Sequence, residues 1–471
     1  MRPPWHVPIL RGGQPYYSLD TIRTPHYRTR EPFVEISQAN VGLIRRDLRH
    51  QREVRAILAG FGAKELYGMC ARAAVLFAES SLPLGDGAQS SEDYVRQVSA
   101  TSGLPNVMVR RNMQKICTVL ADVETVVNGL TRSLSPDVFD AGYAGDVSYF
   151  PRGESLGVVL PSNSPGVHSL WIPAFAMKTP LVLKPGSAEP WTPYRVIQAL
   201  IYSGAPAQVF GYYPADHAGG GEILRQCARG MVFGDVSSTR PWQGDSRIEI
   251  HGPGYSKIVI GEDCIDDFEK YLDVMATSIL ENSGRSCVNA SGVWVPRHAK
   301  AIAEALALRL AGVIPRDEAD EQAEIAPFDD AGVASRISEM IEDELDEGAR
   351  DLSSTHRDRG RLAIYQGCSY LLPTIVLCDS SEHSLANREF LFPFASVVPV
   401  RQEDIPQALG PSLVVTAITH DRALIARLLS SPNVGRLNLG ATPTCKISWD
   451  QPHEGNLFDH LYARRAFQCA V

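Results

Sequence analysis

The feature that most constrains this chain is a series of short apolar strands separated by helical segments. We expect strands at 156–160, 180–183, 208–212 and 231–233, with helices near 168–177, 193–203 and 221–229. Strands that alternate with helices in this way form right-handed βαβ units, which build a parallel sheet covered on both faces. The region therefore predicts an α/β domain with a parallel sheet.

A second α/β region follows the first. Its expected strands lie near 257–260, 291–295, 372–377, 395–400 and 412–418, and its expected helices at 267–281, 297–312, 333–346 and 421–430. Residues 1–45 have no sustained period and predict an extended arm over a domain surface, while 46–131 have helical apolar spacing. Residues 143–160 predict a hairpin that leads into a buried strand.

Composition excludes several classes of function. The 471 residues carry a net charge of -9, so no basic field attracts nucleic acid or anionic lipid. No apolar run is long enough to span a membrane, and the N-terminus lacks the apolar core of a signal peptide, so we expect a cytoplasmic protein. The nine cysteines are scattered without a CxxC pair or zinc-ligand spacing, which predicts free thiols and no metal site.

The common phosphate-binding fingerprints are absent. No GxGxxG follows a strand and no P-loop motif occurs, which argues against a standard Rossmann dehydrogenase and a P-loop kinase. Gly219-Gly220-Gly221 precedes an expected helix, where free backbone N–H groups can hold a phosphate. A plain turn is the better interpretation of these glycines.

Five segments resemble, in order, motifs of the aldehyde dehydrogenase superfamily, over about two thirds of the chain. They are Leu160–Pro165 (LPSNSP, with Ser162 where the family usually has Trp), Val182–Ser187 (VLKPGS), Phe233–Asp235 (FGD), Asn282–Cys287 (NSGRSC) and Glu389–Pro393 (EFLFP). The resemblance implies an aldehyde dehydrogenase-like α/β fold, with two parallel-sheet domains and a bridging oligomerisation hairpin. It also implies NAD or NADP as the cofactor and a small-molecule aldehyde as the substrate.

The chemistry of aldehyde oxidation explains two of these segments. The reaction needs a thiolate that attacks the aldehyde and donors that stabilise the resulting alkoxide. By resemblance, Cys287 is the nucleophile and Asn163 supplies the oxyanion-binding amide. An isolated cysteine is usually a small buried hydrophobe, so the other eight cysteines keep that interpretation.

The remaining segments imply a cofactor site. By resemblance, Lys184 contacts the adenosine ribose, Gly234 and Asp235 form the turn under the pyrophosphate, and Glu389 holds the nicotinamide ribose. Ser187 stands where NAD-preferring relatives often carry a glutamate that grips the adenosine diol. Serine does not repel a 2′-phosphate, so NADP is permitted, while the nearby Glu189 keeps the choice of cofactor open.

The general base is where the chain departs from the family. Hydrolytic members carry a glutamate in a Leu-Glu-Leu-Gly-Gly-Lys segment, and alignment on Gly252 places Ile250 at that glutamate's position. Glu249 is one residue away, on the opposite face of an extended strand, unless a bulge restores it. We keep Glu249 as the first candidate for the base and His251 as the second.

Three functions therefore stay open at this point. The first is oxidation of an aldehyde to a carboxylic acid through a cysteine thiohemiacetal and thioester. The second is a CoA-acylating aldehyde dehydrogenase or acyl-CoA reductase, in which CoA accepts the acyl group, because that branch lacks the base. The third is an inactive binding or scaffold protein that keeps the fold.

The predicted domains follow the same resemblance. A cofactor-binding domain comprises residues 1–139 and 156–250, and a catalytic domain comprises residues 251–454. Residues 140–155 and 455–471 form the oligomerisation hairpin and the C-terminal strand. The apolar end, 466–471, is expected to pair with another subunit as an edge strand, giving a homodimer or homotetramer.

Overall fold

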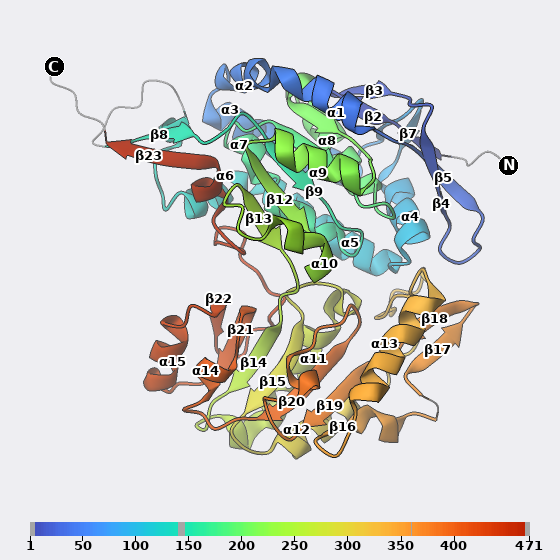
Figure 1. Ribbon diagram of the computed structural model, residues 1–471, viewed down its shortest axis with the longest axis vertical. Helices are drawn as coiled ribbons and strands as arrows, with labels where there is room; N and C mark the ends of the chain where they lie inside the picture. Colours follow the sequence, from blue (N-terminus) through green and yellow to red (C-terminus); the bar gives the residue numbers. More distant parts are fainter. Residues whose placement is uncertain (1–4, 140–146, 359, 467–471) are drawn as a thin grey trace. The chain divides into compact units, whose positions relative to one another are not determined.

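The structure is a computed structural model that describes residues 5–139, 147–358 and 360–466 (Figure 1). It divides into two compact units. The first unit contains the chain up to Ser102, Val109–Gly252 and the segment from Ser448 onward, and the second contains Gly103–Met108 and Pro253–Ile447. The chain therefore leaves the first unit after Gly252 and returns to it at Ser448.

The first unit is built on a seven-stranded sheet. Its strands, in spatial order, are β13 (Ile248–His251), β12 (Arg229–Phe233), β9 (Leu156–Val159), β10 (Leu181–Lys184), β11 (Phe210–Tyr212), β2 (Ile9–Arg11) and β3 (Gln14–Tyr16). The five strands from β13 to β11 are parallel, whereas β2 pairs antiparallel with β11 and β3 pairs antiparallel with β2. After β11 the chain crosses β9 to form β12 (Figure 1), so β9 and β12 flank a topological switch point. Ligands of open α/β sheets bind outside the carboxyl ends of the strands at such a point.

Helices cover the faces of this sheet, which is why its strands are buried. The helices of the first unit are α1 (Val41–Asp47), α2 (Gln51–Ala59), α3 (Ala63–Glu79), α4 (Ser91–Ser102), α5 (Asn106–Ala121, of which Val109 onward belongs to this unit), α6 (Val123–Leu130), α7 (Pro173–Ala176), α8 (Trp191–Tyr202), α9 (His217–Gln226), α10 (Val236–Thr239) and α16 (Leu457–Leu461). Helix α8 is almost fully buried and packs against α3. Continuous apolar runs in the strands are the expected result of burial on both faces.

Two expectations for the first unit were wrong. The N-terminal arm is not a plain surface segment, because β2 and β3 extend the main sheet and a separate sheet forms from β1 (Trp5–Val7), β4 (Thr21–Pro25) and β5 (Pro32–Ser37). Within the described part of the expected hairpin, residues 147–160, the two strands do not pair with each other. β8 (Val147–Pro151) pairs antiparallel with β23 (Tyr462–Ala466) of the same chain, whereas β9 lies inside the main sheet. Residues 140–146 and 467–471 of the predicted oligomerisation elements lie outside the described residues.

The second unit has its own seven-stranded sheet. The spatial order is β16 (Ala349–Asp351), β19 (Thr374–Cys378), β20 (Phe394–Pro399), β15 (Ala290–Val295), β14 (Ser256–Ile260), β21 (Ser412–Ile418) and β22 (Val434–Leu439). All neighbours are parallel except β16 and β19. Its helices are α11 (Leu272–Leu280), α12 (Ala299–Leu310), α13 (Ala331–Glu344), α14 (Ile405–Ala408) and α15 (Arg422–Leu429).

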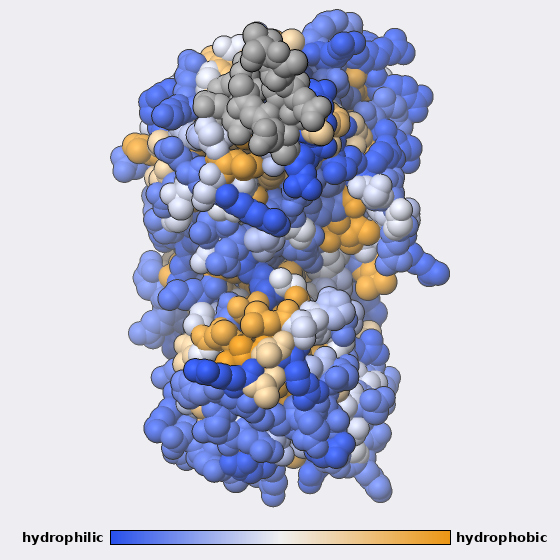
Figure 2. All heavy atoms as spheres, turned by 90° about the vertical axis from the view of Figure 1, so that its left-hand side faces the viewer, coloured by the Kyte–Doolittle hydropathy of each residue, from blue (hydrophilic) through white to orange (hydrophobic). Residues whose placement is uncertain are grey.

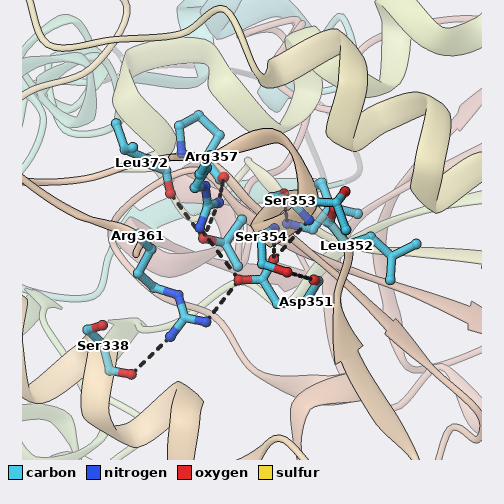
Figure 3. Close-up of polar contacts among 12 residues, drawn as sticks. Ser338, Asp351, Leu352, Ser353, Ser354, Arg357, Arg361 and Leu372 are labelled. Carbon is cyan, nitrogen blue, oxygen red and sulfur yellow. Dashed lines mark hydrogen bonds and ion pairs between the residues drawn. The ribbon is translucent and has the colours of Figure 1, made fainter. Parts of the chain in front are cut away.

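A buried polar network stabilises one margin of this unit (Figure 3). The Asp351 carboxylate accepts hydrogen bonds from the Ser353 backbone N–H at 2.9 Å and from Nη2 of Arg361 at 3.0 Å. Arg361 also donates to the Ser338 carbonyl. Because buried charges are costly unless they are paired and hydrogen-bonded, this network fixes the segment between β16 and β19 in one conformation.

The opposite margin of the sheet is the edge strand β22. Figure 2 shows hydrophobic residues gathered on the side of the second unit where Figure 1 places β22 and α15. Leu429 and Leu439 of these elements are exposed. An edge strand beside exposed apolar side chains is suited to pairing with another chain. The homodimer or homotetramer stays a prediction, which the native mass by light scattering tests.

Within the described ranges, no helix is long and apolar enough to cross a membrane.

Candidate functional site

Three loops meet at the amino end of the second unit's sheet. Cys287 lies just before β15, Gly254 just before β14, and Glu389 on the segment that leads into β20. These three strands are neighbours in the sheet. Loops that precede adjacent parallel strands converge at one edge, so residues more than 130 positions apart in the sequence lie together.

The loop that carries Cys287 has an unusual backbone. Asn282, Ser283 and Gly284 have φ values of 52°, 60° and 66°, which places three consecutive residues in the left-handed region. For a residue other than glycine this region costs about 1 to 2 kcal/mol. A Cβ on Gly284 would lie 2.5 Å from the backbone carbon of Phe392, so this position requires glycine.

Side chains on both sides of Cys287 fix this strained backbone. Asn289 accepts from the Ser286 N–H at 2.9 Å and donates to the carbonyls of Ser278 and Glu281. The buried Arg285 donates to the Ala326 and Pro327 carbonyls. Local strain that is held by many contacts is typical of functional loops.

The backbone of Cys287 is held from the opposite side as well. The Ser256 hydroxyl donates to the Cys287 carbonyl at 2.8 Å. A Cβ on Gly254 would lie 1.9 Å from the same carbonyl oxygen, so only glycine permits this approach. The Glu389 carboxylate accepts from the N–H groups of Gly254 at 3.2 Å and Tyr255 at 2.5 Å. Glu389 therefore anchors the loop that supports Cys287.

Exposure separates Cys287 from most other cysteines. Cys287 is half-buried, whereas Cys70, Cys227 and Cys378 are buried. Burial raises the pKa of the Cys70 and Cys227 thiols to about 12 and that of Cys378 to about 11. Because the thiolate is the nucleophile, these three are chemically quiet at neutral pH.

Lys257, the second residue of β14, is a buried amine close to this loop. Its Nζ donates to the Tyr255 carbonyl at 2.9 Å and to the Ser412 hydroxyl at 3.1 Å. It also lies 5.5 Å from the centre of the Trp294 ring. Burial lowers the pKa of Lys257 to about 8. Sequence analysis did not identify this residue, because an isolated lysine gives no signal of burial.

Lys257 predicts a specific pH dependence of stability. Below pH 8 the amine is charged in both the folded and the unfolded chain, and the cost of burying the charge is fully present. Between about pH 8 and 10.5 the unfolded chain binds more protons, so folding becomes more favourable as the pH rises. We expect the wild type to gain up to about 3 kcal/mol over Lys257→Met across this window. Denaturant unfolding of both proteins at several pH values measures the difference, and a constant difference would contradict it.

In the first unit, the predicted cofactor residues lie at the carboxyl edge of the sheet. Lys184 ends β10, Gly234 follows β12, and the segment with Asn163 follows β9. β9 and β12 flank the topological switch point, where a dinucleotide is expected to bind. Burial lowers the pKa of Lys184, partly offset by Asp216. The position and the donor types fit a nicotinamide cofactor.

Several of these residues also have structural partners. The Asp235 carboxylate caps α10 by accepting from the Ser238 N–H at 2.8 Å and the Ser238 hydroxyl at 2.6 Å. These bonds hold the pKa of Asp235 below its usual value. The three glycines at 219–221 lie inside α9, so both the preferred plain turn and the phosphate loop were wrong. Gly219 packs closely against Ala215.

Ser187 and Glu189, the two residues on which the choice between NAD and NADP depends, lie in different settings. Ser187 is exposed, and its carbonyl accepts a hydrogen bond from the Thr24 hydroxyl. Glu189 is buried, and its carboxylate accepts from the Thr192 N–H and hydroxyl and lies 3.1 Å from Nε2 of His168. Glu189 therefore stabilises the start of α8 and is not available to a bound adenosine.

Glu249, the first candidate for the general base, is also engaged in structural contacts. β13 pairs with β12 in continuous register over its four residues, with no bulge at Glu249. Ile250 packs with Ile248, Leu224 and Val232. Glu249 points to the other face, where its carboxylate lies 3.1 Å from Nε2 of His251 and 3.9 Å from Nδ1 of His460. The bulge that would place Glu249 in the base's position does not form.

Comparison with known proteins gives a consistent result. The model of the aldehyde dehydrogenase family matches residues 88–410. Among solved structures, an indole-3-acetaldehyde dehydrogenase complexed with NAD+ has 17% sequence identity and a TM-score of 0.80, covering 98% of this chain and 96% of that one. An aldehyde dehydrogenase from Bacillus cereus, in an NAD+ complex, has 16% identity and a TM-score of 0.79 over 98% and 96% of the two chains. An NADP-dependent enzyme from E. coli has 16% identity and a TM-score of 0.77 over 98% of each chain.

Proposed function

Because this chain belongs to the aldehyde dehydrogenase family, we propose that it oxidises an aldehyde with NAD or NADP through a thioester on Cys287. The observation that carries the proposal is the loop at the amino end of the second sheet. Its strained backbone is fixed by Ser256, Gly254, Arg285 and Asn289, and it presents a half-buried thiol. A purely structural cysteine does not require such a setting.

The proposed roles follow from the reaction. The Cys287 thiolate attacks the aldehyde carbon, and the oxygen becomes an alkoxide. The Cys287 N–H is one donor for this oxygen, and the Asn163 side-chain amide is the proposed second donor. A bound nicotinamide would supply the hydride acceptor, and loss of the hydride from the thiohemiacetal carbon would leave a thioester on Cys287. Lys184, Gly234 and Asp235 are proposed to bind the cofactor in the first unit, and Glu389 in the second.

We also propose that the enzyme accepts NADP. The exposed Ser187 leaves room beside Lys184, and Glu189 is withdrawn into the core. A carboxylate near a 2′-phosphate repels it by about 1 to 4 kcal/mol, depending on solvent exposure. Ser187→Glu is therefore expected to lower kcat/KM for NADP at least about tenfold and to leave NAD turnover nearly unchanged.

Ser187→Gln is the matched control, because it adds a side chain of the same size without charge. It is expected to retain NADP turnover. Initial-rate kinetics with both cofactors measure the effect. Equal loss of NADP turnover in the glutamate and glutamine variants would show that size, not charge, is responsible.

The fate of the thioester defines a second candidate function. Hydrolysis to a free acid needs a base, and Glu249 was the first candidate. The continuous register of β13 and the contacts of Glu249 with His251 and His460 favour the alternative, in which CoA accepts the acyl group. The geometry of Glu249 is the observation that carries this second proposal.

Adding CoA to the reaction separates the two outcomes. If CoA is the acceptor, the steady-state rate rises many-fold, acyl-CoA is the product, and the rate of Glu249→Gln matches that of the wild type. If water is the acceptor, CoA has no effect and Glu249→Gln slows deacylation, with a burst of reduced cofactor before a slow phase.

A further inference from the structure

A cluster of five ionisable side chains lies in the first unit, where the C-terminal segment packs on β13. β13 contributes Glu249 and His251, the loop before α16 contributes His453 and Glu454, and α16 contributes His460. The His251 side chain is only 2% exposed. Of the side chains that form ion pairs in this cluster, that of Glu454 is the most exposed, at 14%. Ionisable groups at such depth need charge compensation.

His251 is the centre of the cluster. Its ring stacks on Phe233, with 4.3 Å between ring centres and an interplanar angle of 15°. Nε2 lies 3.1 Å from Oε1 of Glu249, and Nδ1 is in close contact with Oε2 of Glu454. Within the described part of the chain, neither ring nitrogen of His251 nor Oε2 of Glu454 has a well-aligned hydrogen bond. Two buried atoms of the kind that ligate metals therefore face each other without satisfied geometry.

His453 completes a possible ligand set. One potential ligand atom from each of His251, His453 and Glu454 can be chosen so that all lie within 4.8 Å of one another. A cavity of about 30 Å³, lined in part by Glu249, His453 and Gly455, lies beside them. A cavity of this size holds about one water-sized sphere, which leaves room for the small movement that coordination needs.

We propose that His251, His453 and Glu454 bind one divalent transition-metal ion, such as Zn²⁺. Two imidazoles and a carboxylate are ligands that zinc accepts, and a water can occupy a fourth position. A metal-bound histidine usually donates its other ring N–H to a carboxylate, and Glu249 lies at the second nitrogen of His251. A dication with neutral imidazoles also balances the two buried carboxylates.

The position of the cluster gives the ion a structural role. His251 is the last residue of β13, one residue before the chain leaves the first unit. His453 and Glu454 lie shortly after the chain returns at Ser448. A bound ion would join these two segments of the first unit to each other. It needs no part in aldehyde oxidation.

Binding of Co²⁺ to the full-length protein after chelator treatment tests the proposal without measuring turnover. The experiment uses the Cys287→Ala protein, so that the reactive thiol cannot bind the ion. We expect one Co²⁺ per chain by calorimetry, with visible absorption bands of low coordination number and no thiolate-to-cobalt band. His453→Gln should weaken binding at least about 100-fold, and Glu249→Gln about 10- to 100-fold.

His298→Gln is the matched control, because His298 is a partly exposed histidine that pairs with Asp266 outside the cluster. It should bind Co²⁺ as the parent does. Glu454→Gln repeats the test if His453→Gln has lost its native circular dichroism spectrum. The proposal is overturned if the parent binds no stoichiometric Co²⁺, or if the cluster variants bind it as tightly as the parent. Either result would identify the cluster as an ion-pair network.

Discussion

Replacing Cys287 with alanine is expected to abolish the formation of reduced cofactor from any aldehyde. No other group in the proposed mechanism can form the covalent intermediate, so the rate should fall by at least about 10⁴-fold. Cofactor binding should persist, because Lys184, Gly234 and Asp235 lie on the first unit's sheet, whereas Cys287 belongs to the second unit. Steady-state rates and cofactor titration measure the two effects separately.

Cys264→Ala is the control for this experiment. Cys264 is a buried thiol of the same unit, and burial raises its pKa, so it has no proposed part in the reaction. The variant should retain wild-type turnover. A substantial rate in Cys287→Ala would contradict the covalent mechanism, and loss of both turnover and cofactor binding would point to a folding defect instead.

Gly284→Ala should have the second largest effect. The new Cβ would lie 2.5 Å from the Phe392 backbone carbon and 2.6 Å from the Pro393 nitrogen, at a φ of 66°. Because neither backbone atom is free to move alone, the loop must shift. Such crowding costs about 1 to 3 kcal/mol, and a displacement of about 1 Å at a reacting atom can cost about 100-fold in rate. We expect kcat to fall at least about 100-fold.

Gly312→Ala provides the matched control. Gly312 follows α12 in the same unit, and an added Cβ there would have nothing within 4 Å. This variant should have wild-type kcat and stability. If Gly284→Ala also retains wild-type kcat, the strained loop does not position the nucleophile, and its conformation has another cause.

The parts of the fold that sequence predicted best are buried parallel strands. The runs at 156–160, 291–295 and 412–418 are continuous and apolar, and the structure has β9, β15 and β21 at these places. Because such a strand is buried on both faces, nearly all its residues are apolar, and the run is easy to identify in the sequence. β22 was missed, because polar residues such as Arg436 and Asn438 interrupt its apolar pattern.

The mistaken hairpin has a different origin. Pro151-Arg152-Gly153-Glu154 carries turn residues between two strand-like segments, which is a local signal for a hairpin. The true partner of β8 is β23, more than 300 residues away in the sequence. Local patterns contain no information about such a partner.

The candidate site also has parts that the sequence predicted and parts that only the fold reveals. Motif resemblance identified Cys287 and Glu389, but the contact of Glu389 with the Gly254 and Tyr255 N–H groups needed the fold. The cluster around His251 combines residues 200 positions apart, so no spacing rule finds it. The one available signal was the adjacent pair His453-Glu454 in the unusual segment between Trp449 and Asn456.

The central claim, a thioester on Cys287, is tested most directly by trapping it. The wild-type protein is mixed with an aldehyde and NADP or NAD, quenched in acid before turnover is complete, and digested for mass spectrometry. We predict that the peptide with Cys287 carries the acyl group of the aldehyde, in an amount that matches the first burst of reduced cofactor. Reduced cofactor that forms while Cys287 stays unmodified at every quench time would contradict the claim.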